Sequence, residues 1–303
     1  MSINSLKING ELLDAAISFG LLLLEIITDG EIHRVPTKSK PCKKNGWYVA
    51  FLNSPICVFG DWSSGERVIF KPSGYQVTLA DRAIIKDQIA AKNYQKKQQQ
   101  QKAAQQAKQR YNKAEPVKNH AYLEHKSVKT MPFLKTEGNL LLVPLIDLSE
   151  KKPKICNLQT IDQHGSKRFM KEGRVKGLCW SIGLLEWCGE GKLYLCEGMV
   201  TAISIQQHTK SPTVAALTSG NLMPVAIILK KRYPNVQLVI AGDDDWLTEQ
   251  KRGINTGKIK ATEVAVSLDA AISFPPFSND QKKMGYTDWN DYFKYCDEVV
   301  INE

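Results

Sequence analysis

The strongest constraint on the fold is a regular alternation of apolar strands and amphipathic helices in the last part of the chain. Apolar runs lie at residues 193–196, 213–216, 237–241 and 270–274, and helical patterns lie between them at residues 200–208, 222–233 and 257–268. Such alternation is typical of a parallel sheet covered by helices on both faces. The sequence therefore predicts an α/β domain, which we place at residues 191–303.

Two of the expected strands run directly into acidic residues. Glu197 follows the first strand, and Asp243, Asp244 and Asp245 follow the third. Functional groups of an open parallel sheet gather at the carboxyl ends of its strands. Because side chains alternate along a strand, Asp243 and Asp245 should share one side and Asp244 should point elsewhere. The set of Glu197, Asp243 and Asp245 suits a hard divalent cation, Mg²⁺ or Mn²⁺, although each acid taken alone could also cap a helix.

The residues before this domain fall into three parts. Residues 1–80 predict a small mixed α+β unit that begins with a helix from Glu11 to Ile27. Residues 81–116 predict a basic helical linker rich in Gln, Lys and Ala, which is either a spacer or a helix that lies along a phosphate backbone. Residues 117–190 contain short apolar strands and predict a mixed α+β subdomain.

The N-terminal unit contains a cluster of aromatic residues: Trp47, Tyr48, Phe51, Phe59 and Trp62. Aromatic side chains in a β-rich unit either stack the bases of a nucleic acid or pack a core, and core packing is the commoner role.

A second basic stretch precedes the acidic strands. Between two glycines at positions 165 and 177 lie five cations: Lys167, Arg168, Lys171, Arg174 and Lys176. A flexible cationic loop beside an acidic site suits the binding of phosphate groups. Arg168 and Arg174 are the first candidates, because a guanidinium group matches phosphate oxygens in geometry.

Composition narrows the possible partners. The 41 Lys and Arg against 31 Asp and Glu give a net charge of +10, which favours a polyanionic partner without identifying it. Seven cysteines without a CxxC pair indicate neither a disulfide framework nor a zinc site. No phosphate-loop motif occurs, so a helicase partner would be a separate protein. The apolar run from Ala15 to Ile27 is too short for a bilayer, so we expect a cytoplasmic protein without membrane contact.

Several ordered segments resemble the TOPRIM-containing DNA primases of plasmids and satellite phages. Cys-Glu-Gly-Met-Val-Thr-Ala at residues 196–202 is similar to the Glu-Gly-Tyr-Ala-Thr-Ala signature of that family. Further similar segments lie at residues 219–226, 240–245 and 255–261, and upstream segments resembling the primase core lie at residues 138–145, 157–159 and 165–169. The likeness covers residues 133–293. It departs from the family at Met199-Val200, usually Tyr-Ala, and at Thr218-Ser219, where relatives often carry an acid.

Downstream, Thr-Asp-Trp-Asn-Asp at residues 287–291 resembles the Asp-Phe-Asn-Asp segment that closes the same family's TOPRIM region. The resemblance implies that Asp288 and Asp291 reach the metal site or order its surroundings. The capping of a surface helix is the competing explanation.

The resemblance implies a TOPRIM-type parallel sheet flanked by helices, preceded by a mixed primase-core subdomain and the N-terminal α+β unit. It also implies a primase, a nucleotidyltransferase that makes short RNA primers from NTPs on single-stranded DNA with Mg²⁺ or Mn²⁺ and without zinc. Glu197 would then be a metal ligand or the general base, and the five cations of residues 165–177 would bind triphosphate or template. Two alternatives stay open: a TOPRIM nuclease or strand-breaking enzyme, and a non-catalytic accessory protein that binds single-stranded DNA in replication.

Overall fold

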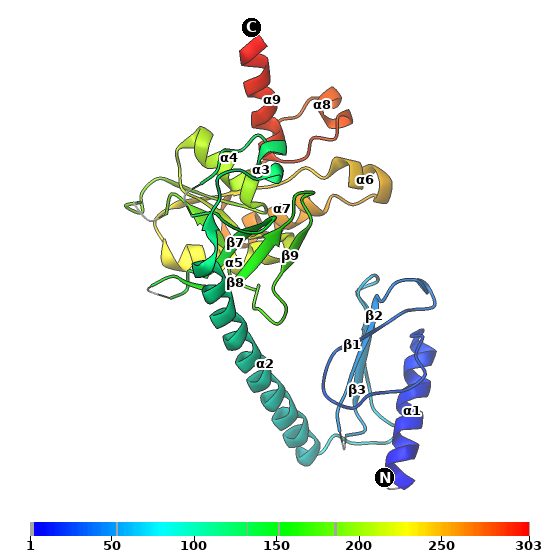
Figure 1. The fold of residues 1–303 in the computed structure, drawn as a ribbon. Coiled ribbons are helices and arrows are strands. Elements are labelled where there is room, and N and C mark those ends of the chain that lie inside the picture. The colour runs from blue at the N-terminus through cyan, green and yellow to red at the C-terminus, as the bar shows by residue number, and fades with distance from the viewer. Residues whose placement is uncertain (1–2, 53, 132, 151, 185–186, 303) are drawn as a thin grey trace. The chain divides into compact units, whose positions relative to one another are not determined.

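The computed structural model describes residues 3–52, 54–131, 133–150, 152–184 and 187–302. The chain divides into two compact units, Met1–Gln98 and Gln99–Glu303, and Figure 1 shows the path of the chain through each. The division falls inside a long helix, within the residues 81–116 for which the sequence predicts a helical linker.

The first unit packs helix α1 (Ile3–Phe19) against one face of an antiparallel sheet (Figure 1). The strands follow chain order: β1 (His33–Val35), β2 (Gly46–Ala50), β3 (Cys57–Asp61) and β4 (Arg67–Phe70). The core joins Leu12 of α1 to Tyr48 and Phe59 of the sheet. The unit is therefore a small α+β layer pair.

The expected helix from residue 11 to residue 27 is wrong in its second half. The helix ends at Phe19 because Gly20 adopts a φ of 110°, a conformation that a helix does not contain. Beyond it, Leu21 forms a bridge to Thr37 and is fully buried. The apolar run after Gly20 thus continues as irregular chain, in which Leu21 is buried and Leu23 and Ile26 pack against the core, whereas Leu24 is 96% exposed.

Helix α2 (Leu79–Lys113) contributes to both units. Its start is capped by Thr78 and Asp81, whose side chains each accept from the other's backbone N–H. Its last turns belong to the second unit, where Ala107 is buried against two strands and Arg110 pairs with Glu137. The expected basic helix is present, and alanines give its C-terminal part a packing face.

The second unit begins with an antiparallel sheet whose strands again follow chain order (Figure 1). They are β5 (Glu115–Pro116), β6 (Lys135–Glu137), β7 (Leu140–Asp147), β8 (Lys154–Ile161) and β9 (Lys167–Phe169), with the short helix α3 (Ala121–His125) after β5. β7 and β8 pair over their whole length with one irregularity after Leu145. The apolar strands expected at 140–145 and 155–161 form the centre of this sheet.

A second sheet in this unit has the order β10-β12-β11-β13-β14. The first strand is antiparallel to its neighbour and the others are parallel. The strands are β10 (Trp180–Ile182), β11 (Lys192–Cys196), β12 (Thr213–Ala215), β13 (Gln237–Ala241) and β14 (Ala271–Ser273). The predicted α/β fold with a parallel sheet is confirmed. The antiparallel edge strand β10 was not expected.

Helices cover both faces of the parallel sheet. The helical elements of this part of the chain are α4 (Met199–Thr209), a 3₁₀ turn (Ser219–Asn221), α5 (Leu222–Arg232), α6 (Trp246–Arg252), α7 (Thr256–Leu268), α8 (Asn279–Lys283) and α9 (Trp289–Asn302), of which α4 packs on one face and α5 and α7 on the other. One core joins α4 to both sheets of the unit, and the other lies between the parallel sheet and α5 and α7. Successive strand residues alternate between the cores: Leu195 faces α5 and α7, and Cys196 faces α4.

No helix in the described ranges combines the length and the apolar character needed to cross a bilayer.

Candidate active site

The acids at the strand ends lie on neighbouring strands. β11 and β13 pair in parallel, with Leu195 opposite Ile240, so the residues that follow both strands leave the same edge of the sheet. The carbonyl of Glu197 accepts a hydrogen bond from Leu217 N–H at 2.7 Å, which ties the end of β11 to the chain after β12. The fold therefore brings Glu197 and Asp243 to one edge.

Burial raises the pKa of Glu197 above its ordinary value, and the charge of Asp245 raises it further. The charge of Lys167 and a hydrogen bond from the Ser219 backbone oppose this rise. Glu197 is thus a carboxylate whose affinity for a proton is increased by its surroundings.

Asp243 is a buried acid that lies among other acids. Burial raises its pKa well above the usual range, and the charges of Asp288 and Glu197 add to the effect. Its Oδ1 is buried and has no hydrogen-bond partner among the described residues. Burying a carboxylate oxygen without a partner costs free energy, so this oxygen favours the binding of a proton or a cation.

The loop at Asp243 is packed too tightly for ordinary residues on either side. At Gly242, a Cβ would lie 2.3 Å from a ring carbon of Phe274 and 2.8 Å from the Cβ of Ala261. At Gly257, a Cβ would lie 2.7 Å from the Asp243 carbonyl oxygen. Two glycines therefore let a strand and a helix approach each other where the acids emerge.

Asp245 is held by the start of α7. Its Oδ2 accepts a hydrogen bond from Gly257 N–H at 3.0 Å, and its own N–H donates to Asn255 Oδ1 at 3.1 Å. Asn255 also caps α7 by accepting from Lys258 N–H. One side chain thus positions both the helix and the acid.

The carboxylate of Asp244 has other partners than the carboxylate of Asp245. Its carboxylate is buried and pairs with Lys258 of α7 at 3.0 Å and Lys282 of α8 at 3.1 Å. Burial alone would raise the pKa of Asp244, but hydrogen bonds from both lysines and Asn255 hold it below its ordinary value. Asp244 is a structural residue that joins the loop to two helices.

Asp288 and Asp291 both bind the start of α9. Asp288 accepts hydrogen bonds from Asp291 N–H at 3.0 Å and from Thr201 Oγ1 at 3.2 Å, while Asp291 accepts from Thr287 N–H and pairs with Lys126 at 3.5 Å. Burial and the charge of Asp291 raise the pKa of Asp288. Asp288 also raises the pKa of Asp243, so it combines a capping role with a place beside the acids.

In the part of the chain that the structure describes, these acids are not arranged as a metal-ligand cluster. Across the described ranges, no three His, Cys, Asp or Glu side chains stand ready to ligate one ion. The fit to a divalent cation rests on the unpartnered oxygen of Asp243 and on acids that raise one another's pKa. An all-oxygen donor set of this kind suits Mg²⁺ or Mn²⁺.

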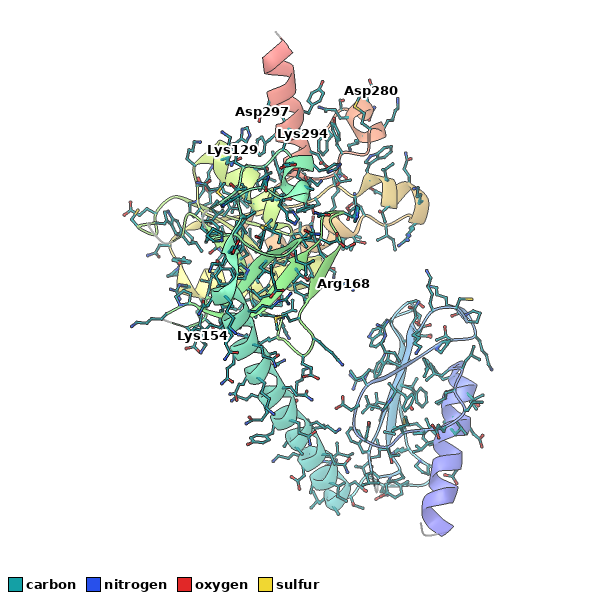
Figure 2. All side chains as sticks on the ribbon, in the orientation of Figure 1. Lys129, Lys154, Arg168, Asp280, Lys294 and Asp297 are labelled. Carbon is teal, nitrogen blue, oxygen red and sulfur yellow. The ribbon has the colours of Figure 1, made fainter. Side chains whose placement is uncertain are left out.

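Of the five cations in residues 165–177, the structure brings Lys167 to the acids. Its charge lowers the pKa of both Glu197 and Asp243, and its Nζ lies 5.8 Å from the centre of the Tyr122 ring. Arg168 follows it on the edge strand β9 and is exposed (Figure 2). The cationic stretch is therefore part strand, not only loop.

The other three cations lie after β9. Arg174 forms an ion pair with Asp147, whose side chain is 8% exposed, and also donates to the Lys176 carbonyl. Lys171 and Lys176 are exposed. The guanidinium of Arg174 thus has a structural partner within the antiparallel sheet.

Sequence reasoning did not single out several residues that shape this site. Asn221 is buried; its amide donates to the carbonyls of Leu178 and Ala216, and its Oδ1 accepts from Gly177 N–H. Asn255 and Asn221 lie in segments that carry the family resemblance, but the resemblance assigned no role to either residue. Thr201 lies in the segment of residues 196–202 that carries the resemblance, whereas Lys126 gave no signal, and only the fold places these two residues beside Asp288 and Asp291.

A family model described as "Toprim domain" matches residues 192–297, and this part of the chain is a Toprim domain. The matched residues include β11 to β14 of the parallel sheet, the helices from α4 to the start of α9, and the acids Glu197, Asp243, Asp244, Asp245, Asp288 and Asp291.

The relatives narrow the class further. The chain is 30% identical over 265 residues to "DNA primase TraC" of Escherichia coli, an alignment that covers 83% of this chain and 24% of the relative. A second "DNA primase TraC" of Escherichia coli is 29% identical over 262 residues, which cover 83% of this chain and 18% of that protein. The predicted resemblance to a TOPRIM-containing DNA primase is confirmed, and the chain spans a quarter or less of the length of these curated relatives.

Among solved structures, the primase of Aquifex aeolicus (zinc-binding and RNA polymerase domains) aligns with 100% of this chain and 84% of its own, at 14% identity and a TM-score of 0.41. The primase fragment of the bacteriophage T7 primase-helicase protein aligns with 54% of this chain and 62% of its own, at 14% identity and a TM-score of 0.38.

Proposed function

We propose that this protein is a DNA primase that makes short RNA primers on single-stranded DNA by divalent-metal-dependent nucleotidyl transfer. The observation that carries the proposal is the buried, unpartnered Oδ1 of Asp243 at the carboxyl edge of the TOPRIM sheet, beside Glu197 and Asp288. Similarity to the TraC primases supports primer synthesis over other phosphoryl chemistry.

Asp243 and Asp245 are the proposed principal metal ligands, with Asp288 and Asp291 as further or outer ligands. Bound there, Mg²⁺ or Mn²⁺ would neutralise the triphosphate and stabilise charge on the transferred phosphoryl group. The chain holds Asp245 in place through Gly257 N–H and Asn255, so this oxygen donor is oriented before substrate arrives.

Glu197 has two possible roles, a third metal ligand or the general base. The raised pKa of its carboxylate supports the second role, in which it takes the proton from the 3′-hydroxyl of the growing primer. A Glu197→Gln variant separates them: loss of the base changes the pH–rate profile at saturating metal, and loss of a ligand raises the metal concentration required.

The cations have separate proposed tasks. Lys167, whose charge already acts on Glu197 and Asp243, binds the triphosphate near the acids. Arg168, Lys171 and Lys176 are exposed and contact the template backbone. Arg174 shapes the segment through its pair with Asp147 and is a weaker candidate for phosphate binding.

The proposed domains keep the boundaries drawn from the sequence. Residues 191–303 form the TOPRIM domain and residues 117–190 the preceding part of the catalytic core, while residues 81–116 connect them to the N-terminal unit of residues 1–80. NTPs and single-stranded DNA are the proposed substrates, and a separate helicase is a possible partner for work on duplex DNA.

The test is incubation of the full chain with single-stranded DNA, labelled NTPs and Mg²⁺ or Mn²⁺. Labelled oligoribonucleotides that disappear in Asp243→Ala and Glu197→Ala support a primase. Shortened DNA instead indicates the nuclease, and DNA binding without any product in the wild type indicates the accessory protein. Primer synthesis that persists in both variants refutes the proposed site.

A further inference from the structure

The sheet of the first unit has one face packed against α1 and one face turned outward. Tyr48 and Phe59, paired across β2 and β3, lie in the core with Leu12 of α1. Neighbouring residues point the other way, and the strand register aligns four of them in one row across the sheet: Arg34, Trp47, Gly60 and Arg67. This outward row combines two cations with an aromatic ring.

A second tryptophan lies against this row. The Trp62 ring stacks on Trp47 at 5.8 Å between centroids and 27° between planes, and the Arg34 guanidinium lies 4.8 Å from the Trp62 ring centre. The backbone N–H of Trp62 donates a hydrogen bond to the carbonyl of Asn45 at 3.0 Å, which holds the backbone in place. Trp62 is nevertheless 50% exposed. The cluster therefore leaves aromatic surface accessible beside a cation.

Space for this arrangement comes from Gly60. A Cβ there would lie 2.9 Å from a ring carbon of Trp47 and 2.4 Å from the Glu66 carbonyl oxygen. The ring of Trp47 thus lies over the glycine, close to the sheet. Of the five aromatic residues in the expected cluster, Trp47 and Trp62 face outward, whereas Tyr48, Phe51 and Phe59 are buried.

The charge around the cluster is one-sided. From residue 32 to residue 60 the chain has no Asp or Glu, but it has five cations: Arg34, Lys38, Lys40, Lys43 and Lys44. The next acid, Asp61, is buried and bound to Ser63 N–H and Oγ at 2.7 and 2.6 Å. The exposed Glu66 accepts from Ser64 Oγ at 3.2 Å. This distribution complements a polyanion.

We propose that this outward face binds single-stranded DNA, with bases stacked on Trp62 and with phosphates held by Arg34 and the lysines of residues 38–44. Stacking on aromatic rings within a cationic surface is the general mode of single-strand binding. Arg34 suits the junction between the two contacts, since it lies over the ring and its fork has further N–H groups for phosphate oxygens. The choice of DNA rests on the proposed function, whereas the stacking and the charge do not.

The test measures the binding of a fluorescent oligo-dT to the full chain by anisotropy, in EDTA and without NTPs. Trp62→Ala should weaken binding by about tenfold at every salt concentration, and Trp62→Phe should restore most of it. Arg34→Ala should instead reduce the salt dependence, by about 0.7 in the slope of log K against log salt for one lost phosphate contact. Lys260→Ala, which removes one partly exposed cation of α7 that pairs with Glu263, is the matched control and should bind like wild type.

A thermal unfolding curve for each variant checks that the chain is folded. Unchanged binding in folded Trp62→Ala overturns the proposal, and so does an equal loss of affinity for a duplex of the same length, because paired bases offer no free face. The proposed function can fail without this proposal. Asp243→Ala should bind oligo-dT like the wild type. If the wild type makes no primers but Trp62→Ala still weakens DNA binding, the binding surface is supported and the primase activity is not.

Discussion

The backbone N–H of Gly257 donates a 3.0 Å hydrogen bond to Oδ2 of Asp245, so the first turn of α7 directly holds one of the acids. The positive end of the helix dipole favours a carboxylate at this place. The approach depends on glycine, because a Cβ at 257 would also lie 3.1 Å from the same oxygen.

Gly257→Ala should therefore lower both stability and activity. The added methyl group meets the Asp243 carbonyl at 2.7 Å and pushes α7 away from the acids, which should cost about 1–3 kcal/mol in the free energy of unfolding. Displacement of Asp245 should reduce primer synthesis by about tenfold or more. Urea unfolding and a primer assay measure the two effects. Gly220→Ala is the control for stability, since a Cβ there has open space, and equal behaviour of both variants would contradict the packing argument.

Asp243→Asn should raise the melting temperature of the metal-free protein. The substitution removes a buried charge that lies beside Asp288 and Glu197, and like charges destabilise one another in a buried site. It should also abolish the rise in melting temperature that we expect Mn²⁺ to give to the wild type by binding the folded state. Thermal unfolding with EDTA or Mn²⁺ measures both. Asp280→Asn, which changes an exposed acid of α8, should keep the Mn²⁺ effect (Figure 2).

Asp244→Asn should destabilise the protein by about 1.5–3 kcal/mol, because it removes charged hydrogen bonds to Lys258 and Lys282. The effect should be largest where the loop meets α8. Hydrogen exchange of the amides in residues 279–283 should become faster, whereas exchange in the first unit should not change. Equal acceleration across both units would contradict a local role.

The pair of Asp147 and Arg174 predicts a pH-dependent loss of stability. Burial alone would raise the pKa of Asp147, but hydrogen bonds from Ser149 and the charge of Arg174 hold it below its ordinary value. A carboxylate whose pKa is lower in the folded state stabilises the fold above the unfolded pKa of about 4, and this stability is lost as the pH falls through the folded pKa.

Asp147→Asn should thus cost about 1.5–3 kcal/mol at pH 7, and the difference from wild type should shrink below pH 4. Chemical unfolding across this pH range provides the measurement. Glu150→Gln is the control, since its carboxylate makes an exposed pair with Lys154 that contributes little. A constant difference at all pH values would exclude the ionised pair as the cause.

The sequence predicted the TOPRIM sheet well because its strands are apolar runs and its helices keep a clear period. It predicted the edge of the sheet that carries Glu197 and Asp243 for the same reason. It failed at Leu21, where an apolar run reads like a helix but packs as irregular chain after Gly20. Periodicity over a few residues cannot separate these cases.

Partners of the acids were harder to predict than the acids. Lys126 and Thr201 reach Asp291 and Asp288 across separations of 165 and 87 residues. Thr201 lies in the motif of residues 196–202, but the motif assigned it no partner, and Lys126 lies in no motif. Arg174 was a first candidate for phosphate binding, and its pairing with Asp147 depends on the fold of the antiparallel sheet. A residue's type indicates what it can bind, but its neighbours in space decide what it does bind.

The three consecutive aspartates have different partners, so their order in the chain matters. Inserting or deleting one residue after β13 would move each acid into a neighbouring position. The carboxylate of Asp244 would then leave its lysines, and one of its neighbours would be forced among Lys258, Lys282 and Asn255. Such a change would keep every acid in the sequence and still misplace all three, so the length of this loop matters as much as its composition.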